Sequence, residues 1–214
     1  MKNYKKWLIL AAACLSYCTL FFTGCSEEQE AVYVPVTENS VEAAADGRVI
    51  GYIVEDFDKE YYDITELGDM VRAEIEIYNE KNASLSTEAG RAPVIVDKVS
   101  MAEDGSAKAV VELNFQNAAV YEDYMGTELF YGTLAEAEAA GYQLAGQLNS
   151  VKKGEALTAE QINKNSDWRV LIVEDTLWIR PGAKVQYLSG NVSLTDEGLV
   201  DGNTSEELKY IIIK

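Results

Sequence analysis

The sequence predicts an α+β fold for residues 47–214. Three observations predict it: an amphipathic helical repeat at 63–79, an Asp-Gly hairpin that follows, and a run of short β-rich segments from Trp168 onward. This part of the chain has 168 residues, which is enough for one domain with an ordinary hydrophobic core.

The first strand and the first helix are predicted from neighbouring patterns. Residues 49–54 form an apolar, β-branched run that ends at acidic residues, which is typical of a strand. Asp63 and Glu66 then have the spacing of a helix capping box. Apolar side chains after them recur at helical spacing, and we expect one buried face made of Leu67, Met70, Val71, Ile75 and Tyr78.

A hairpin and two short helices are predicted next. Asp104-Gly105 lies between alternating runs at 94–101 and 107–115, which is the strongest short-range hairpin pattern. Residues 118–125 suit a helix ended by Gly126.

A strand at 128–132 should come before the second short helix. Thr133 and Glu136 repeat the capping box for that helix, which Gly141 should end. Thr158 and Gln161 predict one further turn of helix.

The C-terminal part is predicted to be an antiparallel β-meander. Turn residues separate five strand-like segments, at 170–173, 177–180, 184–188, 192–194 and 208–213. Residues 210–213 are apolar on both faces, so we expect an interior strand there, because an open edge would invite aggregation. The order over 49–132 is β-α-β-β-α-β, which also suggests a ferredoxin-like core before the meander.

Composition excludes several classes of chemistry. The chain has no histidine, which removes Ser-His-Asp triads and imidazole bases. Its three cysteines all lie in the first 25 residues, so the domain has no thiol chemistry and no Cys-ligated metal. The net charge of −18 makes nucleic acid an unsuitable partner, because phosphate binding needs Lys and Arg. Nucleotide-binding glycine motifs are absent, and no cofactor is expected.

Residues 1–24 have the pattern of an export signal. Three lysines at positions 2, 5 and 6 precede an apolar run over 7–22, and small Gly24 stands just before Cys25. The apolar run is 16 residues long, whereas a membrane-spanning helix needs about 20. An uncleaved signal anchor is the alternative, and both versions place the domain outside the cytoplasm.

The end of this signal, Phe22-Thr23-Gly24-Cys25, resembles the lipobox of bacterial lipoproteins. Phe22 departs from the usual leucine. The resemblance implies cleavage before Cys25, acyl chains such as palmitate on that cysteine, and attachment to the cell membrane facing outward. Two or more chains are expected, because one acyl chain binds a membrane only marginally. The resemblance covers the signal alone and implies no activity.

Residues 25–46 are predicted to be the lipidated cysteine followed by an acidic, flexible linker. The segment has six acids and no Lys or Arg. Loss of the three leader lysines lowers the net charge of the chain from −18 to −21. The alternative for part of the linker is a strand at 32–36 that docks on the domain.

Two groups of side chains are candidate sites in the domain. The first is acidic: Glu55, Asp56, Asp58, Glu60, Asp63 and Glu66. It could bind Ca²⁺, but the spacing fails the EF-hand pattern, and a solvated strand-to-helix loop is favoured. The second is aromatic and could form a ligand-binding face, although half-buried rings are ordinary at a sheet surface. It comprises Tyr61, Tyr62, Tyr121, Tyr124, Phe130, Tyr131, Trp168 and Trp178.

The favoured function is a non-catalytic, membrane-anchored module that binds an envelope protein or glycan. No catalytic residue and no metal ligand is assigned. Two alternatives stay open: a glycoside hydrolase that uses a pair of carboxylates, and a solute-binding lipoprotein of a transporter.

Overall fold

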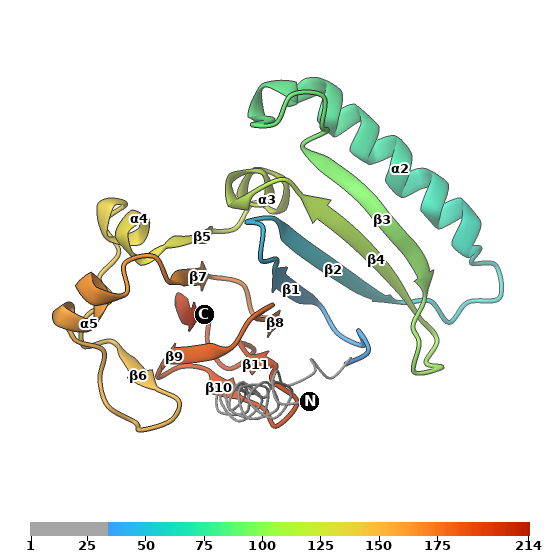
Figure 1. The fold of residues 1–214 in the computed structure, drawn as a ribbon. Coiled ribbons are helices and arrows are strands. Elements are labelled where there is room, and N and C mark those ends of the chain that lie inside the picture. Colours follow the sequence, from blue (N-terminus) through green and yellow to red (C-terminus); the bar gives the residue numbers. More distant parts are fainter. Residues whose placement is uncertain (1–33) are drawn as a thin grey trace, which may run out of the picture. The chain divides into compact units, whose positions relative to one another are not determined.

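The computed structural model describes residues 34–214, which form one compact unit. The predicted export signal and Cys25 lie outside the described residues. The mixed α+β class is confirmed, with two β-sheets and a set of short and long helices (Figure 1).

The larger sheet has seven strands in the order β10-β11-β8-β1-β2-β4-β3. Strands β2 and β4 pair antiparallel over their full length, and β3 forms one edge. The strands are β1 (Ser40–Ala43), β2 (Val49–Asp56), β3 (Val94–Met101), β4 (Lys108–Phe115), β8 (Trp178–Arg180), β10 (Ser193–Leu194) and β11 (Val200–Asp201). The predicted hairpin at Asp104-Gly105 joins β3 to β4 and is therefore confirmed.

The smaller sheet has five antiparallel strands in the order β5-β7-β12-β9-β6. These are β5 (Leu129–Thr133), β6 (Leu148–Ser150), β7 (Arg169–Val173), β9 (Val185–Ser189) and β12 (Lys209–Ile213). The strand predicted to be interior, β12, is the middle strand, and Ile211 and Ile212 have no exposed surface.

The predicted helices are all present. They are α2 (Ile64–Lys81), α3 (Ala118–Met125), α4 (Leu134–Ala139) and α5 (Ala159–Lys164), with a 3₁₀ turn η1 (Ala83–Leu85) after α2. Two of the three predicted capping boxes form in full, at the starts of α4 and α5. At α2 only the Asp63 side chain caps the helix, by accepting from the N–H groups of Thr65 and Glu66. Gly126 ends α3 in the left-handed conformation, with φ of 73°.

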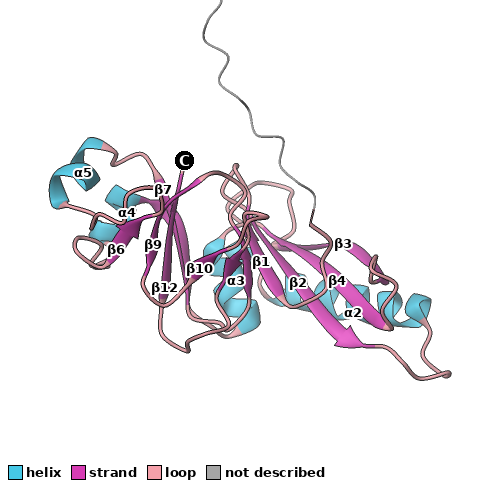
Figure 2. Ribbon diagram, turned by 90° about the horizontal axis from the view of Figure 1, so that it is seen from below, coloured by secondary structure: helices cyan, strands magenta, loops and turns pink. Residues whose placement is uncertain are grey.

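Two large hydrophobic cores and one small cluster of Val54, Ala102 and Val110 hold these layers together. The larger core contains buried side chains from both sheets, such as Val41, Leu113, Leu171 and Ile211, so the sheets share one interior. The smaller core lies between the other side of the five-stranded sheet and α4 and α5. α2 packs along the edge strand β3, on the part of the sheet formed by β2, β4 and β3 (Figure 2).

The folded domain begins earlier than residue 47, so the prediction of a flexible linker up to residue 46 is wrong for its second half. β1 pairs with β2 on one side and with β8 on the other. Ahead of it, the Arg180 guanidinium donates to the carbonyl oxygens of Val34 and Pro35 at 2.8 and 3.0 Å. Residues 34–38 are thus docked on the domain, as the alternative expected, but not as a strand.

The finer topology differs from a single ferredoxin-like sheet. β2, β3 and β4 lie together, with α2 connecting β2 to β3, but β5 pairs with β7 in the other sheet. The predicted C-terminal strands are all present, and they are divided between the two sheets. The division of these strands between the two sheets depends on pairing with strands that are distant in the sequence. Local sequence patterns do not predict such pairing.

Candidate functional site

A groove of about 670 Å³ lies between α2 and the exposed part of the seven-stranded sheet. Its floor comes from β2 and β4, one wall from α2, one end from the loop before α2, and the other end from α3. Its lining is mostly apolar, and all of its charged lining residues are acidic.

Strand alternation builds the apolar floor. Successive side chains of a strand point to opposite faces, so Ile53 of β2 and Val111 and Leu113 of β4 all face α2. Ile53 and Val111 are paired across the two strands, which makes the floor continuous. Leu67 and Val71, one helical turn apart, supply the apolar part of the α2 wall.

Aromatic side chains close both ends of the groove. At one end, the rings of Phe57 and Tyr62 stack at 4.8 Å, and Tyr61 meets Tyr62 edge-on at 5.0 Å. At the other end, the Tyr124 hydroxyl donates to Glu74 of α2 at 3.3 Å. Burial and the Glu74 carboxylate raise the pKa of Tyr124, so it remains a neutral donor. The groove therefore has a defined length along α2.

Two large side chains at the groove are far more exposed than a core residue would be. Tyr61 is 77 % exposed and Met70 is 70 % exposed. The prediction that Met70 belongs to the buried face of the helix is wrong, whereas Ile75 of the same face is 4 % exposed. Exposed methionine and tyrosine are suited to contact with a partner, since they offer large area and adapt to its shape.

The rim of the groove is acidic. Five carboxylates line it, and none of its described lining residues is Lys or Arg: Glu55, Asp56, Asp63, Glu66 and Glu74. Asp63 is the N-cap of α2. It accepts hydrogen bonds from the main-chain N–H groups of Thr65 and Glu66, and these bonds lower its pKa. The other four form no ion pair within residues 34–214.

The structure brings together only part of each predicted group. Four of the six clustered acids reach the groove, whereas Asp58 pairs with Lys59 at 2.7 Å and Glu60 lies outside. No three metal-ligating side chains gather anywhere in residues 34–214.

Of the eight candidate aromatics, three line the groove: Tyr61, Tyr62 and Tyr124. Tyr121 is buried in the larger core, and Phe130 and Trp168 pack on the smaller one. The aromatic group is therefore scattered, and no continuous face forms from it.

Sequence reasoning missed the groove itself. Leu67 and Val71 have the spacing of core residues, and nothing in that spacing shows that part of the sheet beneath them lacks a cover. One signal was present: Glu66, Met70 and Glu74 follow one another at intervals of four, which places acids beside a methionine on one helical stripe.

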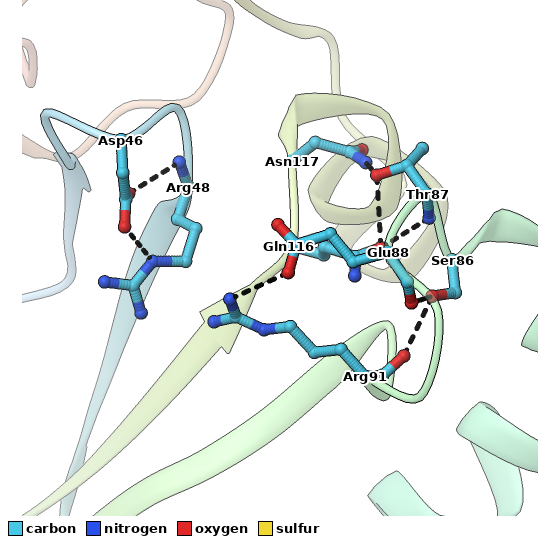
Figure 3. A network of polar contacts seen from close by, with 8 residues as sticks. All are labelled: Asp46, Arg48, Ser86, Thr87, Glu88, Arg91, Gln116 and Asn117. Carbon is cyan, nitrogen blue, oxygen red and sulfur yellow. Dashed lines mark hydrogen bonds and ion pairs between the residues drawn. The ribbon is translucent and has the colours of Figure 1, made fainter.

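A second cavity, of about 620 Å³, lies beneath the C-terminal half of α2. The loop at 86–91 forms its edge, where Gln116 accepts from the Thr87 N–H at 2.7 Å and the Ser86 hydroxyl donates to main-chain oxygens (Figure 3). Its lining mixes Arg72 and Arg91 with Glu76 and Glu80. This mixture gives it no clear preference for a ligand of either charge.

Comparison with protein families, curated proteins and solved structures finds no match to this chain. Within residues 34–214, no helix combines the length and apolarity needed to cross a bilayer. The site has to be interpreted from its own geometry.

Proposed function

We propose that this chain is a membrane-anchored binding module outside the cytoplasm, and that its groove holds a short basic, amphipathic peptide segment of a partner protein. One observation carries the proposal: an apolar floor lies beside four carboxylates that have no ion pair within residues 34–214. Apolar side chains of the partner would cover Ile53 and Val111, and its Lys or Arg side chains would meet the rim.

The dimensions of the groove favour a short extended peptide. Its α2 wall runs from Glu66 to Glu74, which corresponds to about 12 Å at 1.5 Å per residue. An extended chain covers that length with about four residues. Aromatic rings at both ends would limit the part of the segment that lies in the groove to this size.

The anchor rests on the lipobox resemblance around Cys25. Both the mature chain and anionic lipid are negatively charged, so the protein surface should not be attracted to the membrane. Labelling with a fatty-acid analogue tests the anchor, and we expect Cys25→Ala to abolish the label. Retained label in that variant would overturn the anchor. The glycoside hydrolase and the transporter receptor stay sequence-based predictions that no feature of the groove favours.

Peptide binding can be measured directly with the full chain in a neutral detergent. The probe is a fluorescent, end-blocked hexapeptide of alternating lysine and leucine, followed by anisotropy. We expect saturable binding that weakens as salt rises, because the rim acids are near the surface. A peptide with glutamate in place of lysine should not bind.

A charge reversal on α2 tests whether peptide binding depends on the groove or only on the net negative charge of the chain. Glu66→Lys should weaken binding on the order of fivefold, since one favourable contact becomes a repulsion. Glu76→Lys makes the same charge change on the same helix but outside the groove, and it should have a much smaller effect. Equal losses in the two variants would show attraction to net charge alone and would overturn the groove.

A further inference from the structure

A smaller hollow of about 270 Å³ lies beside the groove. Ile53 lines both spaces, so they are neighbours along β2. Tyr124 of α3 closes the groove, whereas Tyr121 and Met125 of the same helix face the hollow. Gly51 lies two residues from Ile53, a step of about 7 Å along the strand.

The hollow has one charged group in its lining, the carboxylate of Asp175. Asp175 accepts a long hydrogen bond, of 3.4 Å, from the Tyr121 hydroxyl. It forms no ion pair within residues 34–214. Burial and the Asp175 charge raise the pKa of Tyr121, so this hydroxyl is a neutral donor and leaves the negative charge in place.

Lys209, whose charge interacts with that of Asp175, donates its hydrogen bond to another acceptor. Lys209 is fully buried in β12, and its ammonium group donates to the main-chain oxygen of Glu174 at 2.7 Å. Burial lowers the pKa of this lysine, because the charged form is poorly solvated there. Asp175 therefore lines the hollow with no cation of residues 34–214 at ion-pair distance.

β2 contributes a glycine, Gly51, to the lining of the hollow. A Cβ added to Gly51 would lie 3.0 Å from the Phe115 ring and 3.4 Å from the Tyr121 ring. Those two rings already pack edge-to-face at 5.0 Å, so they have little freedom to move aside. The floor is thus rigid, and its space is open on the side of Asp175 and the partly exposed Met125.

We infer that this hollow is a second subsite, which takes the ammonium or guanidinium end of one Lys or Arg of the same peptide. The inference rests on the proposed function, because the groove would hold the rest of the segment. The apolar stem of the side chain would pass Ile53 and Met125, and its charged end would pair with Asp175. The partner segment would then need a basic residue at one fixed position, beyond general positive charge.

A double-mutant cycle tests the subsite with the same lysine–leucine hexapeptide and the full chain. Asp175→Asn keeps an acceptor for Tyr121 and removes the charge. We expect a loss of several fold for the parent peptide. Replacing each lysine of the peptide in turn by norleucine should reveal one position at which Asp175→Asn causes no additional loss. Glu174→Gln, a neighbouring exposed acid outside the hollow, is the matched control and should leave affinity unchanged.

The outcomes distinguish the subsite from the groove. If Glu66→Lys weakens binding but Asp175→Asn does not, the subsite is wrong and the groove stands. If Asp175→Asn weakens every peptide equally, its role is structural and the subsite is overturned. If neither variant changes binding of the hexapeptide, the proposed function itself fails. Thermal unfolding of each variant shows whether the domain has stayed intact.

Discussion

Gly182 lies directly against the main-chain carbonyl oxygen of Ala43, at the end of β1. Its φ of 64° is in the left-handed region that favours glycine, and a Cβ at this position would collide with that carbonyl. The turn after β8 therefore fits against the strand that pairs with β8, and only a residue without a side chain permits the approach.

Gly182→Ala should destabilise the domain by more than about 3 kcal/mol, because steric overlap adds to the left-handed penalty. Gly198→Ala is the control: φ is 86° there, and an added Cβ would meet nothing within 4 Å. That variant should lose only about 1 kcal/mol. Urea unfolding followed by circular dichroism measures both, and similar losses would contradict the packing described for Gly182.

Ile211 in the middle of β12 should be among the most sensitive core positions. It has no exposed surface and contributes to the interior that the two sheets share. Ile211→Ala should lower the free energy of unfolding by about 2–5 kcal/mol, through lost burial and the cavity left behind. Leu194→Ala, at a side chain that is 40 % exposed, should change it by less than about 0.5 kcal/mol. The same urea titration would show whether the core has been assigned correctly.

The domain should lose stability in alkali because of its buried tyrosines. Burial raises the pKa of Tyr121, and the same holds for Tyr52, Tyr78 and Tyr142. Their stabilising contribution is complete below about pH 10, where tyrosine in the unfolded chain starts to ionise, and declines above it. Unfolding free energies measured from pH 8 to 11 should therefore fall steeply at the upper end.

Tyr121→Phe should reduce the fall in unfolding free energy at high pH, because the variant lacks one hydroxyl that must stay protonated in the folded state. The cost at pH 8 should be at most about 1 kcal/mol, from the long hydrogen bond to Asp175. Tyr61→Phe, at a ring that is 77 % exposed, should leave the whole curve unchanged. If the Tyr121 variant keeps the full alkaline fall, its hydroxyl is not a cause of it.

Glu112 on β4 should oppose folding at neutral pH. Burial, followed by the nearby Asp97 carboxylate, raises the pKa of Glu112. The folded protein thus holds this proton more tightly than the unfolded chain, and stability falls as pH rises through the interval between the two pKa values. Glu112→Gln should raise the free energy of unfolding at pH 7, and the gain should vanish near pH 3. A loss at pH 7 would contradict this reading of the sheet surface.

Features set by neighbouring residues could be predicted from the sequence. The Asp104-Gly105 turn forms with Gly105 at φ of 78°, and the Ser106 N–H donates to Asp104. Asp63 caps α2, as its position before the helical repeat predicts. In each case the hydrogen-bond donor and acceptor lie within a few residues, so the pattern itself contains the interaction.

Features set by distant pairing could not be predicted. β5 resembles a fourth strand of the first sheet in chain order, yet its partner is Val173 and the rest of β7. The groove also depends on contacts between distant parts of the chain. Leu67 and Met70 share a helical face but differ in what lies beneath them. The acids at 55–66 form a group in the sequence. Their position beside an apolar floor depends on where α2 lies on the sheet.

The position of β1 has a consequence for the order of folding. Ser40 and Arg180 are in contact although 140 residues separate them, and the parallel pairing of β1 with β8 joins the beginning of the domain to its last third. During synthesis, β1 and β2 can form a hairpin early, but one edge of β1 has no partner until the chain extends past residue 180. Closure of that sheet is a late, non-local event, and such events make folding slow.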